Sequence, residues 1–229
     1  MDAEFVNSFL NNWLILSIGT KGSGKTYLML KYLKFALKND LYDQYVLVLP
    51  MFTMEQNNSY KFINAKDKRI YVFESYNEVI TANLLKQQEK DKVKKKVLFI
   101  IDDASGENVF RIDPSLQHMI TSIRHYNIGC WMLIHSTSNI LSPFIRQQCD
   151  LLLLYKITNY KLLKNIYEEF LSLMEDYTGN NGHKFFIDKV INVQKEKYQC
   201  IYMNIRTGSI DYNVKKWNFE NLTSEIINE

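Results

Sequence analysis

The eight residues GTKGSGKT, at positions 19–26, constrain this chain more than any other part of its sequence. The chain has only 8 glycines in 229 residues, and three of them fall within this stretch. The stretch fits the pattern G-x-x-x-x-G-K-[ST], which links a buried strand to a helix in proteins that bind nucleotide phosphates. The apolar run WLILSI at 13–18 precedes it, and residues 25–38 follow with leucines at helical spacing. A strand, a phosphate-binding loop (P-loop, Walker A) and a helix are therefore expected.

Each residue type in the loop has a physical role in holding a triphosphate. Glycines let backbone N–H groups surround phosphate oxygens, and the following helix adds its positive amino-terminal end. Lys25 is expected to reach the β and γ phosphates, and the Thr26 hydroxyl to coordinate Mg²⁺. The sequence thus predicts a site for ATP, or a close relative, with Mg²⁺. The predicted nucleotide-binding residues are Gly19, Thr20, Lys21, Gly22, Ser23, Gly24, Lys25 and Thr26.

A second apolar run, VLFII at 97–101, ends in the two carboxylates Asp102 and Asp103. A carboxylate at the end of such a strand (Walker B) holds Mg²⁺ in P-loop NTPases, and we assign this role to Asp102. Asp103 is the candidate for the acid that orients and activates water, although its side chain is shorter than the common Glu. Glu107 is the alternative base. These residues predict an enzyme that hydrolyses ATP.

The remaining elements alternate between strands and helices along the chain. Helical spacing is expected at 75–90, 114–126 and 158–176. Further apolar runs predict strands at 45–49, 70–73, 130–134 and 151–155. This alternation predicts an α/β fold whose mostly parallel sheet has helices on both faces. Two strands between the P-loop strand and the acidic strand favour the additional-strand class of P-loop ATPases.

The chain is expected to form a P-loop ATPase core at 1–178 and a small β-rich extension of the same domain at 179–229. In the extension, KFFI, YQCIYMNI and IDYNV are expected to form short strands at one edge of the sheet. In the core, Asp113 is a plausible cap for the helix that begins at Pro114. Residues 136–149 are expected to form a polar loop.

Composition limits the classes of function. The formal net charge of +3 permits a nucleic-acid partner without requiring one. The three cysteines have no C-x-x-C spacing, so neither a zinc site nor a disulfide framework is predicted. No apolar run approaches the roughly 20 residues that span a bilayer, and the opening MDAEF lacks the basic region of a signal peptide. An intracellular protein without a membrane span is expected.

Polar residues after the acidic strand are further candidates for catalysis. His135 and Ser136 end the strand CWMLI, beside the expected position of the γ phosphate, and could sense hydrolysis. Arg124 and Arg146 could act as arginine fingers in a neighbouring subunit's site. The alternatives are that His135 caps the strand and that each arginine is a solvated or salt-bridged surface residue.

In this order, the blocks resemble the viral DNA-packaging ATPases of the FtsK/HerA superfamily, the poxvirus-type group of large DNA viruses and virophages. The matching text is GTKGSGKT, VLFIIDDA, RHYNIG with the CWMLIHS strand, and SPFIR. The first block is common to P-loop proteins, whereas the R-H-x-x-I and P-x-x-R blocks make the match specific. The resemblance spans about 19–155.

The resemblance implies an ATP-driven motor that assembles as a homo-oligomeric ring, pentameric or hexameric, and pulls double-stranded DNA into a preformed capsid. It implies DNA contacts without sequence reading, a capsid or portal-vertex protein as partner, and a location in the host cytoplasm (viral factory) or the virion. Relatives usually carry Gln where this chain has His135 and Ser136. Either one of these residues replaces that sensor, or coupling is altered.

Two lysine clusters are candidates for DNA contact, and each is also consistent with a solvated surface. One is the lysine-rich run 86–96, and the other consists of Lys189, Lys195, Lys197, Lys215 and Lys216. Two other functions compete with the motor: a small-molecule P-loop kinase and a nucleotide-dependent switch with little hydrolysis. A kinase would need an arginine-rich lid, and the few arginines of this chain form no such cluster.

Overall fold

The computed structural model describes residues 6–7, 10–49, 60–63, 66–102, 112–135, 141–172, 182–193 and 198–211. The strands are β1 (Leu14–Ile18), β2 (Gln44–Val48), β3 (Ile70–Phe73), β4 (Val97–Ile101), β5 (Ile128–Ile134), β6 (Leu151–Leu154), β7 (Ile201–Asn204) and β8 (Ser209–Asp211). They form one eight-stranded sheet with the order β3-β2-β4-β5-β1-β6-β7-β8. The first six strands run parallel, and β7 and β8 are added antiparallel. The predicted α/β fold is confirmed.

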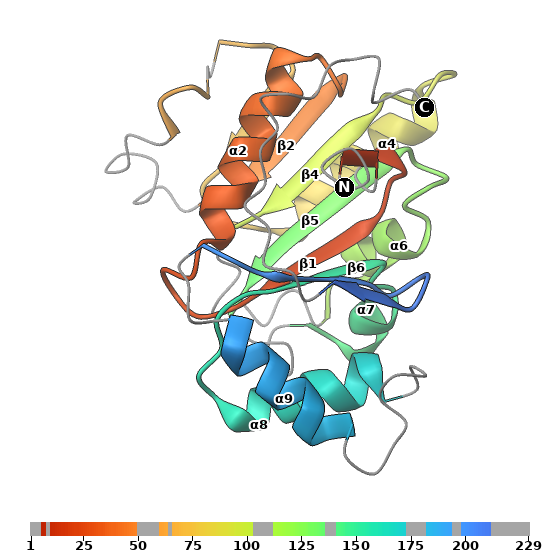
Figure 1. Ribbon diagram of the computed structural model, residues 1–229. Helices are drawn as coiled ribbons and strands as arrows, with labels where there is room; N and C mark the ends of the chain where they lie inside the picture. Colours follow the sequence, from red (N-terminus) through yellow and green to blue (C-terminus); the bar gives the residue numbers. More distant parts are fainter. Residues whose placement is uncertain are drawn as a thin grey trace.

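The helices are α2 (Lys25–Lys38), α4 (Glu78–Lys90), α6 (Pro114–Thr121), α7 (Pro143–Gln147), α8 (Tyr160–Ile166), the π-helical turn η2 (Tyr167–Leu171) and α9 (Gly182–Val193). Helix α2 covers one face of the sheet, and α4, α6 and α7 cover the other (Figure 1). None of the helices in the described residues is both long and apolar enough to cross a bilayer.

The position of β5 identifies the class of the sheet. β5 pairs in parallel with β1 on one side and with β4 on the other. An additional strand therefore separates the strand that leads into the P-loop from the strand that ends in Asp102. This order confirms the additional-strand arrangement that the sequence predicted.

The central strands are buried on both faces, which explains their unbroken apolar runs. In β1, Leu14 and Leu16 pack into a core shared with α4, α6 and the helices after β6. Ile15 points to the opposite face, into a core that α2 completes with Tyr32 and Leu33. Because successive side chains of a strand alternate between faces, one short apolar strand anchors both cores.

Two sequence predictions are wrong in the described residues. KFFI was expected as a strand but lies in α9, where Phe186, Ile187 and Val190 are buried at helical spacing. The polar loop predicted at 136–149 contains the short helix α7. Its start carries a helix signature, since the Ser142 hydroxyl accepts a hydrogen bond from the Ile145 N–H and Pro143 takes the first position.

Other elements differ from the expectation mainly in length. α6 starts at Pro114 with Asp113 as its cap, as predicted, but ends at Thr121 rather than near Tyr126. The helix expected at 158–176 begins at Tyr160 and passes into the π-helical turn η2. β7 and β8 confirm the short strands that were expected at one edge, and the structure shows that they are antiparallel.

Candidate nucleotide-binding site

The P-loop connects the end of β1 to the start of α2, at the carboxyl edge of the parallel strands. Gly24 precedes α2 with a φ of 109°, a left-handed conformation that favours glycine. Gly19 is required for a different reason, because a Cβ there would lie 2.6 Å from Cβ of Tyr155. Close packing at Gly19 and the left-handed φ at Gly24 thus exclude side chains at these two positions of the loop.

Lys25 is only 6% exposed, so its ammonium group needs close polar partners. Its Nζ donates hydrogen bonds to the carbonyl oxygens of Gly19, at 2.6 Å, and Thr20, at 3.2 Å. It also lies 3.3 Å from Nδ1 of His135. These contacts hold the positive charge within the loop that is expected to surround the phosphates.

His135 follows β5 and reaches the P-loop from the neighbouring strand. Its Nδ1 lies 2.9 Å from the carbonyl oxygen of Gly19, the same oxygen that accepts from Lys25. β1 and β5 are paired so that Ile18 is opposite Ile134, which brings the two strand ends together. The sequence predicted His135 at the end of its strand, and its direct contact with Lys25 comes from the structure.

Thr26 of α2 contacts Asp102, which follows β4, although β5 lies between β1 and β4 in the sheet. The Thr26 hydroxyl donates to the Asp102 carboxylate, 3.2 Å from Oδ1 and 3.0 Å from Oδ2. Hydroxyl and carboxylate oxygens are the ligands that Mg²⁺ prefers, and Mg²⁺ sites of this kind are completed by substrate phosphates and water. The two residues therefore fit the metal role that the sequence assigned to them.

Tyr60 is a site residue that the sequence analysis missed. It is 3% exposed, and its hydroxyl donates to Oδ2 of Asp102 at 3.1 Å. The hydrogen bond fixes the orientation of a carboxylate that is itself only 6% exposed. The polar, irregular sequence around Tyr60 carries no motif that would have indicated this contact.

Lys25, Thr26, Asp102 and His135 border one cavity of about 300 Å³. Its lining comes from the P-loop, from the ends of β4 and β5, and from the segment before β7: Lys21, Gly22, Ser23, Gly24, Lys25, Thr26, Tyr27, Asp102, His135 and Tyr198. Most of the predicted nucleotide-binding residues thus surround one space. Tyr27 and Tyr198 are the aromatic side chains among these lining residues.

Three predicted catalytic residues, Asp103, Glu107 and Ser136, lie outside the described residues. The same holds for four lysines of the second predicted DNA-contact cluster: Lys195, Lys197, Lys215 and Lys216. Lys189 is exposed on α9. In the first cluster, Lys86 and Lys90 lie in the last part of α4, and the other lysines of the run 86–96 lie between α4 and the amino end of β4.

Neither predicted arginine finger lines the cavity. Arg146 is largely buried, with Nε 3.0 Å from Oε2 of Glu169 and Nη1 donating to the carbonyl oxygen of Leu141 at 2.7 Å. Burial raises the pKa of Glu169, and the nearby Arg146 opposes that rise. Arg146 therefore ties α7 to η2 within the chain.

Arg124 lies at the amino edge of the sheet, the edge opposite the P-loop. Its Nη2 is 3.4 Å from Oδ1 of Asp150, and Nε of Arg206 is also 3.4 Å from that oxygen. The other Asp150 oxygen accepts a 2.8 Å hydrogen bond from the Leu14 N–H. Burial raises the pKa of Asp150, although these contacts oppose the rise.

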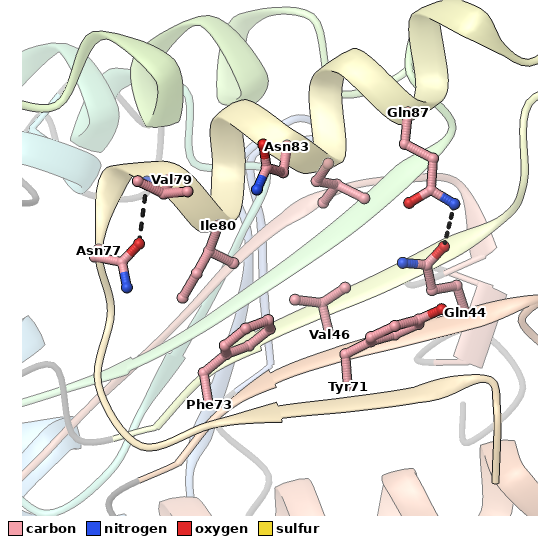
Figure 2. Close-up of a pocket in the computed structure, with 10 residues that line it drawn as sticks. Gln44, Val46, Tyr71, Phe73, Asn77, Val79, Ile80, Asn83 and Gln87 are labelled. Atoms are coloured by element: carbon pink, nitrogen blue, oxygen red, sulfur yellow. Dashed lines mark hydrogen bonds between the residues drawn. The ribbon is translucent and has the colours of Figure 1, made fainter.

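A second cavity, of about 290 Å³, lies between α4 and strands β2 and β3 (Figure 2). The side-chain Nε2 of Gln87 in α4 donates a hydrogen bond to Oε1 of Gln44 in β2, at 3.4 Å. Tyr71 and Phe73 of β3 line its floor. None of the predicted site residues lines this cavity, which lies beside the edge strand of the sheet.

No protein-family model and no curated protein sequence matches this chain. The fold, however, is similar to that of B204, described as the genome packaging NTPase of Sulfolobus turreted icosahedral virus 2. A structure of B204 with AMP has a TM-score of 0.64 and 16% identity, and the match covers 90% of this chain and 98% of B204. B204 of Sulfolobus turreted icosahedral virus, described as a DNA-packaging ATPase, gives a TM-score of 0.66 at 18% identity, covering 90% of this chain and 98% of that one.

A weaker similarity links the chain to ATPases 2 and 3 of EssC from Geobacillus thermodenitrificans. The TM-score is 0.50 at 11% identity, and the match covers 69% of this chain and 34% of EssC. The EssC match is partial, whereas the two B204 matches extend over almost the whole length of both partners. The chain therefore has the fold of the viral packaging NTPases that its sequence motifs resemble.

Proposed function

We propose that this protein is an ATP-hydrolysing motor that moves double-stranded viral DNA into a preformed capsid. The observation that carries the proposal is the meeting of Lys25, Thr26 and Asp102 at one cavity. The surrounding fold supports it, since 90% of the chain matches a genome packaging NTPase.

The chemistry follows from the lining of the cavity. Lys25 offsets the charge of the β and γ phosphates, while the backbone N–H groups of the P-loop bind their oxygens. Thr26 and Asp102 would hold Mg²⁺, which neutralises charge that develops on the phosphate oxygens. Asp103 is proposed to orient the attacking water, with Glu107 as the alternative.

His135 is our preferred replacement for the sensor Gln, with Ser136 as the alternative. The 3.3 Å contact between His135 and Lys25 supports this choice, because a phosphate that draws Lys25 away changes the surroundings of the imidazole. His135 also contacts the Gly19 carbonyl, so a change at the γ phosphate reaches both β1 and β5.

A translocating motor also requires neighbouring subunits and DNA. We propose a homo-oligomeric ring, pentameric or hexameric, in which Arg124 or Arg146 acts on the site of the next subunit. The DNA contacts would be to phosphates, without sequence reading. A capsid or portal-vertex protein is the proposed docking partner, and the host cytoplasm or the virion is the proposed location.

The test is ATPase turnover with and without long double-stranded DNA, over a range of protein concentrations. A ring motor should be stimulated by DNA, and its activity should rise more steeply than protein concentration because active sites form between subunits. ATPase turnover that is not stimulated by DNA and stays proportional to protein concentration would refute the proposal of a motor.

A further inference from the structure

Two tyrosines form an aromatic pair in the cavity of the P-loop. Tyr27 follows Thr26 directly, and Tyr198 comes from the segment that leads into β7. Their ring centres are 5.1 Å apart, with 33° between the ring planes. Large aromatic side chains are usually well buried, but these two are 49% and 54% exposed.

The backbone at Tyr198 is in a conformation that an aromatic residue rarely adopts. Its φ is 64°, within the left-handed region where glycine is unstrained and a bulky side chain is not. Strained backbone of this kind clusters at functional sites. The conformation of Tyr198 therefore points to a use for its ring.

The pair is packed directly onto the phosphate-binding loop. A Cβ added at Gly24 would lie 2.8 Å from Cα of Tyr198 and 2.9 Å from its Cδ1, so the tyrosine rests against the last glycine of the loop. On Tyr27, the ammonium of Lys31 lies 5.0 Å from the ring centre. Tyr27 is thus contacted by both Tyr198 and Lys31, and Tyr198 retains the larger exposed fraction.

The topology explains why a residue so late in the chain reaches this place. β7 runs antiparallel to β6, and Ile201 pairs with Leu154 at the carboxyl end of β6. The residues just before β7 therefore arrive at the same edge of the sheet as the P-loop. Tyr198, which lies in the carboxyl-terminal extension, therefore becomes part of the cavity wall.

We propose that Tyr198, packed against Tyr27, is the stacking surface for the base of the bound nucleotide. This inference rests on the proposed nucleotide-binding function. Once the P-loop binds the phosphates, the nucleoside must lie within its own length of Gly24, and the Tyr27–Tyr198 pair is the aromatic surface in the cavity wall. Stacking on an aromatic face suits any base, because every base has a π face.

The test compares a ligand that has a base with one that has none. Calorimetry measures the binding of a non-hydrolysable ATP analogue and of inorganic tripolyphosphate, each with Mg²⁺, to the wild type and to Tyr198→Gly. The glycine accommodates the left-handed φ and removes the ring, so the effect reports the ring and not the strain. We expect the analogue to bind about tenfold more weakly and tripolyphosphate to bind within about twofold of wild type.

Two further variants complete the design. Tyr198→Phe keeps the ring and should retain the affinity for the analogue. Tyr71→Ala removes a tyrosine of similar exposure, 44%, from the distant edge strand β3 and should leave both affinities unchanged. Unchanged binding of tripolyphosphate also shows that the P-loop of each variant is folded.

The results separate this inference from the proposed function. If Tyr198→Gly binds the analogue like wild type, or loses both ligands equally, the base does not stack on Tyr198, and the phosphate site stands. If neither ligand binds the wild type, the nucleotide-binding function and the stacking surface both fall.

Discussion

The two edges of the parallel sheet carry similar groups of charged side chains that are used differently. At the carboxyl edge, Lys25, Thr26 and Asp102 line a cavity of about 300 Å³. At the amino edge, Arg124 and Arg206 converge on one carboxylate, Asp150. The first arrangement leaves space for a ligand among its charged groups, whereas in the second a buried carboxylate is paired with two arginines that lie partly in solvent.

The difference shows that a cluster of charges indicates a binding site only when a cavity and the backbone accompany it. Gly19 and Gly24 are the means by which the carboxyl edge remains open, since side chains there would collide with Tyr155 and Tyr198. At the amino edge, the Leu14 N–H donates a hydrogen bond to the carboxylate of Asp150, and this contact fixes the start of β1. We therefore expect changes at the carboxyl edge to alter activity and changes at the amino edge to alter stability.

The largest effect should come from Lys25→Ala, which removes the cation that faces the phosphates. ATPase turnover is expected to fall about 100- to 1000-fold, and the free energy of unfolding should not fall, because burying a charge is itself costly. Lys34→Ala, an exposed lysine on the same helix, is the matched control and should keep full activity. If Lys25→Ala keeps its activity, the expectation that changes at the carboxyl edge alter activity is wrong.

Gly24→Ala and Gly208→Ala compare glycines that serve the two edges, both with positive φ. A Cβ at Gly208 meets nothing within 4 Å, whereas a Cβ at Gly24 meets Tyr198. Urea unfolding should therefore show a loss of about 1 kcal/mol for Gly208→Ala and about 3 kcal/mol for Gly24→Ala. Only Gly24→Ala should weaken nucleotide binding, and equal effects in both assays would argue against the close packing of the P-loop.

Asp150→Ala tests the amino edge directly. It leaves Arg124, Arg206 and the Leu14 N–H without their shared acceptor, and the free energy of unfolding should fall by about 2 kcal/mol. ATPase activity per folded molecule should be unchanged if Arg146 is the arginine finger, because of the two candidate fingers only Arg124 loses its partner in this variant. A fall in activity larger than the fall in folded protein would mean that this edge also contributes to turnover.

Tyr60→Phe removes the hydroxyl that holds Asp102 and keeps the buried ring. The loss of about 1 kcal/mol should appear as a roughly fivefold increase in the Mg²⁺ concentration needed for half-maximal ATPase activity. Tyr71→Phe, in the second cavity, is the control. If the Mg²⁺ requirement is unchanged, Tyr60 has a packing role and does not orient the carboxylate.

The smallest effect concerns pH and Asp150. Since burial raises the pKa of Asp150 in the folded protein, its ionisation opposes folding, and its contribution to stability falls as pH rises through that pKa. Asp150→Asn removes this dependence, so its stability relative to wild type should increase from about pH 3 to about pH 7. Urea unfolding at several pH values measures the difference, and an opposite slope would show that the arginines dominate over burial.

The parts of the molecule that the sequence predicted well depend on local patterns. β1, the P-loop and α2 follow from an apolar run, a glycine pattern and helical spacing within about thirty residues. β4 and Asp102 follow from a second run of the same kind. In each case the residues that form the element are neighbours in the chain, so their pattern is visible without the fold.

The missed contacts are those that only the fold creates. Tyr60 reaches Asp102, and Tyr198 reaches Gly24, from segments with no motif. The contacts of Asp150 join four separate parts of the chain, because its partners are the Leu14 N–H, Arg124 and Arg206. No sequence motif relates these positions. α9 was misread because KFFI has no polar break, although its burial follows helical spacing.

The position of β1 has a consequence for how the chain folds. β1 precedes the other described strands in the sequence, yet its two neighbours, β5 and β6, both come from the second half of the chain. Contacts between such distant segments form slowly, because a long loop must close first. The P-loop therefore cannot be held in place until most of the chain has emerged from the ribosome. A nascent chain should be unable to bind nucleotide before β5 and β6 have paired with β1.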